Sequence, residues 1–284
     1  MVDIMDKSGC TRRQFVNTGL TAVAGLAAMT AGRGASAADK PYGPFRMGMQ
    51  SYSLRGYDVD TALDMTQKLG VHYWEAFPAH VPLTDSTDKI AEMLAKLKAH
   101  KITLTSWGVQ GFTSDEAAAR KVFDFAKRYG LRTLSADPAP ESFNMLEKLV
   151  EEYKINIAIH NHGPGARYDK LSSVLAAVQG RHPRIGACVD TGHALRSSED
   201  PVEWVKRLDK RVFELHLKDV KGTTQFTEIG KGDLRTVELF RQLNKMKFPW
   251  LVALEYEEHE KEVGPYLDLC FAATRDAIEK ALKG

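Results

Sequence analysis

The 284-residue chain has few cysteines and almost no excess of charge of either sign. Its three cysteines, Cys10, Cys188 and Cys270, are too few and too widely spaced for a disulfide framework. The 39 lysines and arginines nearly balance the 37 aspartates and glutamates, which gives a formal net charge of +2. No long run of one sign occurs, so the charge pattern argues against a nucleic-acid partner. The remaining composition is that of an ordinary globular protein.

The first 37 residues lack the pattern of a folded domain. Twin arginines at Arg12-Arg13 precede an apolar run over residues 19–31, and Ala35-Ser36-Ala37 is a small-residue cleavage sequence. This order is typical of a twin-arginine export signal, whereas a chance Arg-Arg pair before a mildly apolar helix is the alternative. The apolar run is short for a membrane span. We therefore expect a signal peptide over residues 1–37, a mature domain over residues 38–284 with no membrane contact after cleavage, and a periplasmic or secreted location.

No G-x-G-x-x-G motif follows the first apolar strand, and no linker or composition shift marks a second domain. Short apolar segments typical of buried strands alternate with amphipathic helical segments. The strand segments are residues 46–51, 72–77, 102–107, 133–136, 155–160, 185–189, 212–217 and 251–255. Eight strand–helix units in strict alternation predict an α/β fold, a single (β/α)8 TIM barrel. A doubly wound open sheet is the competing fold, and the missing glycine motif disfavours its dinucleotide-binding form.

Polar side chains stand at the carboxyl ends of nearly all of these strands, where a (β/α)8 barrel forms its site. Each one alone is best explained as a polar group that leaves the core for solvent. Burying many acids and imidazoles at one mouth is costly unless they are paired. A divalent cation is the simplest common partner, and mixed imidazole and carboxylate ligands favour manganese, iron, cobalt or zinc. The residues are Gln50, Tyr52, Glu75, Trp107, Asp137, His160, His162, Asp190, His193, His216, Lys218, Asp219, Glu255 and Glu257.

The segment Ile157–Gly163 (IAIHNHG) ends one of these strands with two histidines that flank an asparagine. Side chains two residues apart on a strand share a face. The pair is either a hydrogen-bonded strand end without metal or a part of a metal site. In a metal site His160 is the expected ligand, and a one-residue shift of register would make it His162. Glu257 lies in the charged run E-E-H-E-K and is expected to be exposed.

Four motifs make the chain resemble the xylose isomerase-like TIM barrels. This family contains sugar isomerases, ketose 3-epimerases, inosose dehydratase and endonuclease IV, and the resemblance covers essentially the whole mature chain. The motifs are VDTGH (residues 189–193), LHLKD (residues 215–219), Leu254-Glu255 at the end of the last strand, and the loop IGKGD (residues 229–233).

The resemblance implies a divalent metal held by Asp190, His216 and Glu255. At the end of the fifth strand the epimerases carry a glutamate that is both a ligand and an acid/base, and here His160 stands in its place. A neutral imidazole can still bind metal, so we expect His160 to be the fourth ligand. Mn²⁺ is the favoured cofactor, with Co²⁺, Zn²⁺, Fe²⁺ or Mg²⁺ as alternatives.

The missing glutamate bears on the reaction. Epimerisation is served by a carboxylate on each face of a carbon, so its replacement by histidine disfavours simple 3-epimerisation. A histidine at this place resembles inosose dehydratase, and exported relatives include lyases that cleave 3-keto-glycosides. We expect an enzyme that removes the proton next to a carbonyl through a metal-stabilised enediolate, foremost a lyase on 3-keto-glycosides. A sugar isomerase or epimerase and a non-catalytic sugar-binding barrel are the alternatives.

These hypotheses assign roles to the other strand-end residues. Glu255 or His162 is the expected base, while Lys218 would stabilise an oxyanion or protonate a leaving oxygen. His193 lies close to the substrate in the family. An endonuclease IV activity is disfavoured by the balanced charge, the incomplete histidine-rich metal set and the expected export.

Two further residues are expected to contact the substrate. Glu75 could hold a hydroxyl, and Trp107 either offers a flat face to a sugar ring or packs inside the barrel. The expected partner is a small-molecule carbohydrate and not a nucleic acid, and a homo-oligomer is left open.

Overall fold

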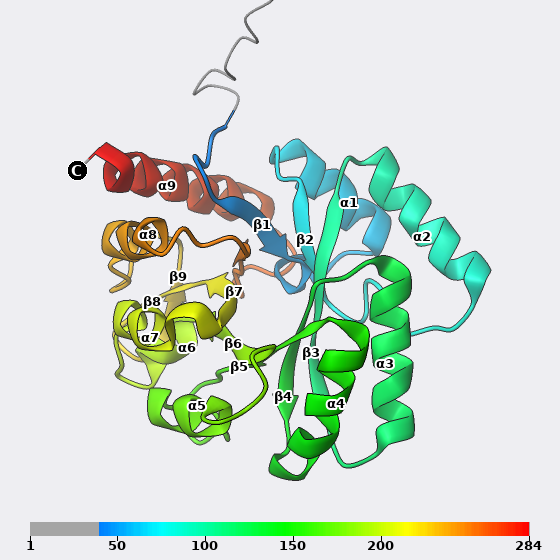
Figure 1. Ribbon diagram of the computed structural model, residues 1–284. Helices are drawn as coiled ribbons and strands as arrows, with labels where there is room; N and C mark the ends of the chain where they lie inside the picture. The colour runs from blue at the N-terminus through cyan, green and yellow to red at the C-terminus, as the bar shows by residue number, and fades with distance from the viewer. Residues whose placement is uncertain (1–39, 284) are drawn as a thin grey trace, which may run out of the picture. The chain divides into compact units, whose positions relative to one another are not determined.

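Eight parallel strands close into a barrel in the order β1-β10-β7-β6-β5-β4-β3-β2 (Figure 1). The computed structural model describes residues 40–283, and the expected export signal lies outside them. The closed barrel confirms the predicted (β/α)8 fold, and each predicted strand has its counterpart. The strands are β1 (Arg46–Gln50), β2 (Tyr73–Ala76), β3 (Thr103–Phe112), β4 (Thr133–Pro138), β5 (Asn156–His160), β6 (Ile185–Asp190), β7 (Val212–Leu217) and β10 (Leu251–Leu254).

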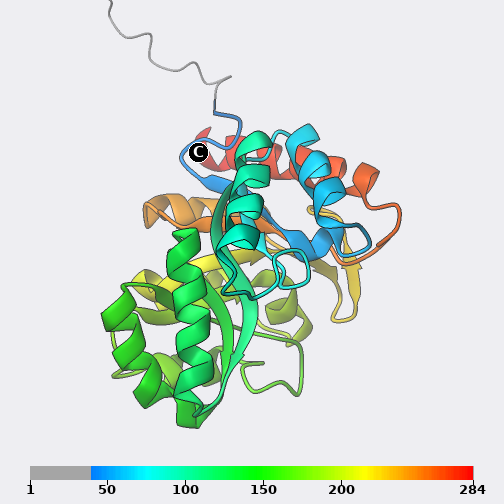
Figure 2. The same ribbon diagram turned by 90° about the vertical axis from the view of Figure 1, so that its right-hand side faces the viewer.

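Helices cover the outside of the barrel, as the turned view in Figure 2 shows. Each barrel strand is followed by at least one helix before the chain enters the next strand of the barrel, and α9 follows the last one. Among residues 40–283, no helix has both the length and the apolar character that a membrane crossing requires. The helices are α1 (Val59–Lys68), α2 (Thr87–Ala99), α3 (Glu116–Tyr129), α4 (Phe143–Tyr153), α5 (Leu171–Val178), α6 (Thr191–Arg196), α7 (Pro201–Leu208), α8 (Thr236–Lys245) and α9 (Gly264–Lys283).

Several of these helices start at the caps that the sequence indicates. The Asp58 carboxylate accepts a hydrogen bond from the backbone N–H of Thr61 at 2.8 Å, and that of Asp115 accepts one from Ala118 at 3.0 Å. Helix α3 ends at Gly130, whose φ of 69° is left-handed. Because each helix follows a strand, these N-caps anchor the chain at the same barrel end where the polar strand-end residues lie.

Two elements of the described chain have no counterpart in the sequence prediction. Helix α6 follows β6 directly, and the strands β8 (Asp219–Lys221) and β9 (Gln225–Thr227) form an antiparallel hairpin after β7. Elements of six and three residues are too short to produce a recognisable hydrophobic period. Both lie next to the mouth of the barrel and shape it.

A single carboxylate organises the connection that contains this hairpin. Asp219 accepts hydrogen bonds from the backbone N–H groups of Val220, Gly230, Gly232 and Leu234, at 2.9 to 3.1 Å. A Cβ atom on Gly232 would lie 2.2 Å from an oxygen of this carboxylate, so the position requires glycine. The IGKGD loop is therefore a cradle for the buried Asp219 side chain.

We predict that Asp219→Ala lowers the free energy of unfolding by about 2–4 kcal/mol, because the substitution leaves several N–H groups without an acceptor. Urea unfolding of the mature domain measures the change. Asp276→Ala is the control, since Asp276 forms only an exposed pair with Lys280 and its loss should cost under about 0.5 kcal/mol. Equal losses in the two variants would contradict the cradle.

Candidate metal centre and substrate cavity

Four side chains converge at the carboxyl end of the barrel. They come from the neighbouring strands β5, β6, β7 and β10, and all four are buried. Each offers one ligand atom, and these atoms lie within 4.8 Å of one another. Nε2 of His160 is 3.4 Å from Oδ2 of Asp190, and Nδ1 of His216 is 3.1 Å from Oε2 of Glu255. The structure thus brings together the four residues expected to hold a metal.

The spacing and the unpartnered atoms of this cluster fit a divalent metal. Ligand bonds of about 2.0–2.2 Å at tetrahedral or octahedral angles place ligand atoms about 3–3.5 Å apart, close to the separations seen here. Oδ2 of Asp190, Nδ1 of His216 and Oε2 of Glu255 are buried and form no regular hydrogen bond within the described chain, and the two carboxylate oxygens share a single ion-pair partner, the Lys218 ammonium at 3.1 Å. Buried polar atoms are almost always satisfied, so three such atoms facing one point indicate a shared ligand.

The charge of the cluster also calls for a cation. The ammonium of Lys218 lies 3.1 Å from both Asp190 and Glu255 and contacts Glu257. With His216 neutral, as a metal ligand must be, three carboxylates and one ammonium leave two formal negative charges, which one divalent metal would neutralise. Burial alone would lower the pKa of Lys218, but the three carboxylates hold it above its usual value. Likewise, burial would raise the pKa of Glu255, but Lys218 and His216 lower it.

The backbone around Asp190 fixes the direction of its carboxylate. Oδ1 accepts a hydrogen bond from the backbone N–H of His193 at 2.7 Å and so caps helix α6, which leaves Oδ2 for the cluster. The amide of Asn161 pairs with the backbone of Asp190 on both sides, at 2.8 and 2.9 Å. This pairing extends the β5–β6 contact by one step beyond His160. His160 therefore sits in the cluster, whereas His162 lies outside it on the cavity wall.

Glu75 supports the cluster from below rather than lining the cavity. It is fully buried, and one oxygen contacts Nε2 of His216 while the other accepts a hydrogen bond from Ser135. A carboxylate behind a ligating histidine fixes the ring and turns its other nitrogen, here Nδ1, to the metal side. Burial and the Glu75 charge raise the pKa of the adjacent Glu214 well above its usual value. The expectation that Glu75 holds a substrate hydroxyl is therefore not met by its position.

Thr191 and Gly192 place Lys218. The Thr191 hydroxyl donates to the backbone oxygen of Lys218 at 2.6 Å, and the backbone N–H of Lys218 lies 2.9 Å from the same hydroxyl oxygen. A Cβ atom on Gly192 would lie 2.6 Å from Cγ of Lys218, so only glycine leaves room for the lysine stem. The last four residues of the VDTGH motif thus have successive roles. Asp190 is a candidate metal ligand, Thr191 bonds the backbone of Lys218, Gly192 leaves room for the Lys218 stem, and His193 lines the cavity.

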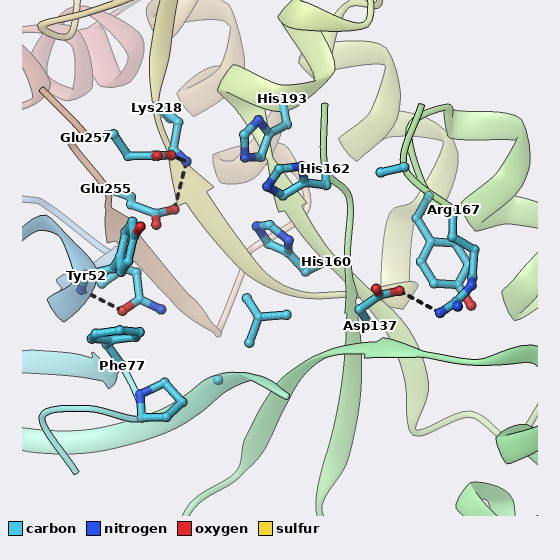
Figure 3. Close-up of a pocket in the computed structure, with 16 residues that line it drawn as sticks. Tyr52, Phe77, Asp137, His160, His162, Arg167, His193, Lys218, Glu255 and Glu257 are labelled. Carbon is cyan, nitrogen blue, oxygen red and sulfur yellow. Dashed lines mark hydrogen bonds and ion pairs between the residues drawn. The ribbon is translucent and has the colours of Figure 1, made fainter. Parts of the chain in front are cut away.

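A cavity of about 500 Å³ opens above the cluster, with a polar wall and an apolar wall (Figure 3). Its volume lies within the range of small-molecule sites. The polar wall comes from β5, β6, β7 and β10, and the apolar wall from the ends of β1, β2 and β3. The polar wall contains His160, His162, His193, Lys218, Glu255 and Glu257, and the apolar wall contains Tyr52, Phe77, Pro78 and Val109.

Two expectations about the walls are corrected by the structure. Glu257 is not a solvated charge, because its carboxylate lines the cavity and pairs with Lys218. Its place follows the strand alternation from Glu255, which the charged run obscured. Trp107 does not face the cavity: it is 1% exposed, packs against Phe125 and donates a hydrogen bond to the Val81 carbonyl at 2.9 Å. Its packing interpretation holds.

Arg167 and Tyr168, which were not among the predicted site residues, form the far end of the cavity together with Asp137. The Arg167 guanidinium pairs with Asp137 at 3.0 Å, and the Tyr168 hydroxyl donates to the Pro138 carbonyl at 2.7 Å (Figure 3). Arg167 and Tyr168 belong to the loop after β5. Loop residues follow no hydrophobic period, so no sequence signal pointed to them.

Two histidines lie side by side on the polar wall. The ring centroids of His162 and His193 are 4.0 Å apart, at an interplanar angle of 36°. Burial, and after it the proximity of His160, lowers the pKa of His162. Burial also lowers the pKa of His193, to about 2. Both rings are therefore neutral at neutral pH.

Comparisons with known proteins concern the family and the fold. A family profile described as xylose isomerase-like TIM barrel matches residues 137–282. The rhizopine catabolism protein MocC of Rhizobium meliloti is 32% identical over 98 residues, which is 34% of this chain and 30% of that protein. Inosose dehydratase of Mesomycoplasma hyopneumoniae is 26% identical over 145 residues, 44% of this chain and 48% of that enzyme. The chain thus matches half or less of the length of these relatives.

A solved structure of the protein IolI with a bound zinc atom superposes with a TM-score of 0.63. It is 19% identical, and the match covers 84% of this chain and 96% of that chain. At this identity the likeness concerns the fold.

We predict that the mature domain binds one divalent metal and that Asp190→Asn lowers the affinity at least about 100-fold, because it removes a ligand charge. Elemental analysis and calorimetric titration with Mn²⁺ and Zn²⁺ measure this. Asp137→Asn is the matched control, since Asp137 lines the same cavity outside the cluster. A wild-type domain that binds no divalent ion, or equal affinities in both variants, would remove the metal centre.

Proposed function

The chain belongs to the xylose isomerase-like TIM barrel family, and from this we propose that it is an exported, divalent-metal-dependent enzyme acting on keto-sugars. The proposed reaction begins with removal of the proton on the carbon next to a carbonyl. The favoured activity is that of a lyase on 3-keto-glycosides, which expels the anomeric substituent. The observation that carries the proposal is the convergence of His160, Asp190, His216 and Glu255 beneath a cavity with neutral histidines on its wall.

The side chains of the cavity divide the work. A bound divalent metal would supply a Lewis acid that polarises the carbonyl and offsets negative charge on oxygen. Lys218 keeps its proton among the carboxylates and therefore acts as a fixed positive charge beside the developing oxyanion. His162 is neutral and exposed to the cavity, so it is available to accept the proton. Glu255 is the second candidate for this role.

The arrangement of carboxylates favours elimination over epimerisation. Within the cavity, Glu255 and Glu257 both follow β10 and lie on one side, while Asp137 at the far end is paired with Arg167. A two-base epimerisation is served by acid/base groups on opposite faces of a carbon, and the β5 side presents imidazoles. One reported relative supports elimination, since its name, inosose dehydratase, denotes the removal of water. A sugar isomerase or epimerase is the second candidate.

The test is a proton NMR assay in D₂O with the metal-loaded mature domain. With a 3-keto-glucoside we expect release of the aglycone and formation of an unsaturated keto-sugar. With a simple ketohexose we expect no deuterium next to the carbonyl. Deuterium uptake without bond cleavage would instead establish the isomerase or epimerase, and inactivity of the loaded protein on both substrates would contradict both proposals.

Variants locate the base within the same assay. His162→Gln should lower the rate of proton abstraction about 10²–10⁴-fold while metal binding is kept, because His162 is outside the cluster. Glu255→Gln should lose metal binding and activity together. If His162→Gln is fully active, Glu255 becomes the base. Arg167→Met, at the far end of the cavity, controls for general changes of the cavity.

We propose export on the strength of the Arg12-Arg13 segment and the Ala35-Ser36-Ala37 sequence. Replacing both arginines by lysine in the full-length chain should retain the protein, uncleaved, inside the cell. Fractionation and mass spectrometry of the N-terminus in a bacterium with a twin-arginine translocase measure this. An unprocessed wild-type protein that stays inside the cell would refute the proposal.

A further inference from the structure

The polar wall contains one contact to which the proposed reaction assigns no role. Arg196 is the last residue of α6, and its Nη1 lies 3.1 Å from Nδ1 of His193. Its guanidinium carbon lies 5.2 Å from the ring centroid of Phe226, on the β8–β9 hairpin. On another side the guanidinium abuts Gly163, where a Cβ atom would come within 2.8 Å of Nη1. The guanidinium is thus held by a glycine, an aromatic ring and a histidine.

This contact decides which nitrogen of His193 carries the proton. A guanidinium has five N–H donors and no acceptor, and it does not lose its proton in proteins. Nδ1 of His193 must therefore be the acceptor of the hydrogen bond. In a neutral imidazole the proton is then on Nε2.

The protonated nitrogen is the one left for a ligand. His193 lines the cavity, and its Nε2 makes no hydrogen bond within residues 40–283. Its backbone N–H donates a hydrogen bond to Oδ1 of Asp190, which anchors the residue beside the candidate metal ligands.

We propose that Arg196 is a positioning residue that fixes His193 in the Nε2–H tautomer, so that His193 donates a hydrogen bond to a substrate oxygen. In this role His193 neither accepts a hydroxyl proton nor serves as the base. It is a neutral hydrogen-bond donor that complements the charged Lys218 on the same wall of the cavity. The part that concerns the substrate rests on the proposed function, whereas the tautomer does not.

The same contacts assign a purpose to two otherwise unexplained features. Gly163, the glycine of the HNHG segment, leaves the space through which the guanidinium reaches His193. The β8–β9 hairpin carries Phe226, which covers the other side of the guanidinium and meets the His193 ring edge-on at 5.9 Å. Segments after β5, β6 and β7 therefore meet at one arginine.

The tautomer is measured without reference to activity, by long-range ¹H–¹⁵N NMR of the histidine rings in the zinc-loaded mature domain. His193→Gln assigns the signal by its loss. We expect wild-type His193 to show a protonated Nε2 and an unprotonated Nδ1. Arg196→Met should give a mixture of tautomers, and Arg196→Lys, which keeps a cationic donor, should retain much of the wild-type pattern. A protonated Nδ1 in the wild type, or no change in Arg196→Met, would overturn the proposal.

A second variant tests the contact between Arg196 and His193 without changing either residue. Gly163→Ala should push the end of the flexible arginine aside and reproduce the mixed tautomers of Arg196→Met in a folded protein. Gly111→Ala is the matched control, because a Cβ atom there meets nothing within 4 Å. Wild-type spectra in Gly163→Ala would show that the guanidinium has another route to His193 and would contradict the role assigned to Gly163.

Activity then separates this inference from the proposed function. On the keto-glycoside, Arg196→Met should lower kcat about 10- to 100-fold with a smaller change in KM, as for a weakened oxyanion donor. If the tautomer changes but kcat does not, His193 has no catalytic part and the donor role is wrong. If the wild type shows the Nε2–H tautomer but turns over neither sugar, the proposed function fails while the role of Arg196 in fixing the tautomer stands.

Discussion

The structure of the site depends on how the two oxygens of Asp190 are shared. Oδ1 accepts a hydrogen bond from the N-terminus of α6, and Oδ2 is thereby turned toward His160, His216 and the Lys218 ammonium, which lies 3.1 Å away. The helix start alone would be satisfied by many capping residues. Lys218 is shared among the carboxylates of Asp190, Glu255 and Glu257, so a further cation at Oδ2 would lower the cost of burying this charge. Asp190 thus positions His193 through Oδ1 and faces the candidate metal site through Oδ2, and the short helix α6 links the two.

Beneath this layer the barrel interior is polar where packing alone would favour aliphatic side chains. Glu75 and Glu214 are fully buried, as is His216 above them. Replacing such groups by apolar residues often stabilises a protein, so their presence reflects a requirement of the site rather than of the fold. Glu75 orients His216, and Ser106 satisfies one oxygen of Glu214 at 2.6 Å. A cation above Glu255 and Asp190 would neutralise the charge that makes this stack costly.

The strands could be predicted from the alternation of apolar and amphipathic segments. The four clustered residues are a subset of the strand-end polar residues, and it was the resemblance to the xylose isomerase-like barrels that selected them. Strand ends of a parallel barrel meet at one mouth, and His160, Asp190 and Glu255 end or directly follow their strands, so order along the chain translated into proximity. The misjudged residues needed information that periodicity does not contain. The predicted strand ended at Trp107, but β3 continues to Phe112, its register shifts after Trp107, and the indole turns to Val81. Glu257 was expected to be solvated because its neighbours are charged, yet its carboxylate pairs with the buried Lys218 while Arg55 donates to its backbone oxygen at 2.5 Å.

The hydrogen bond between Arg196 and His193 could not be predicted from strand order or periodicity, and it bears on the mechanism. A histidine beside a metal cluster reads equally as ligand, base or donor, and only the partner of its second nitrogen separates these roles. Here that partner is an arginine that cannot accept a proton, and it comes from the same six-residue helix that Asp190 caps. His160 lies within the cluster, and His193 is committed as a donor. Among the histidines of the polar wall, this leaves His162 as the ring whose nitrogens are free of both tasks, which is why proton abstraction is assigned to it.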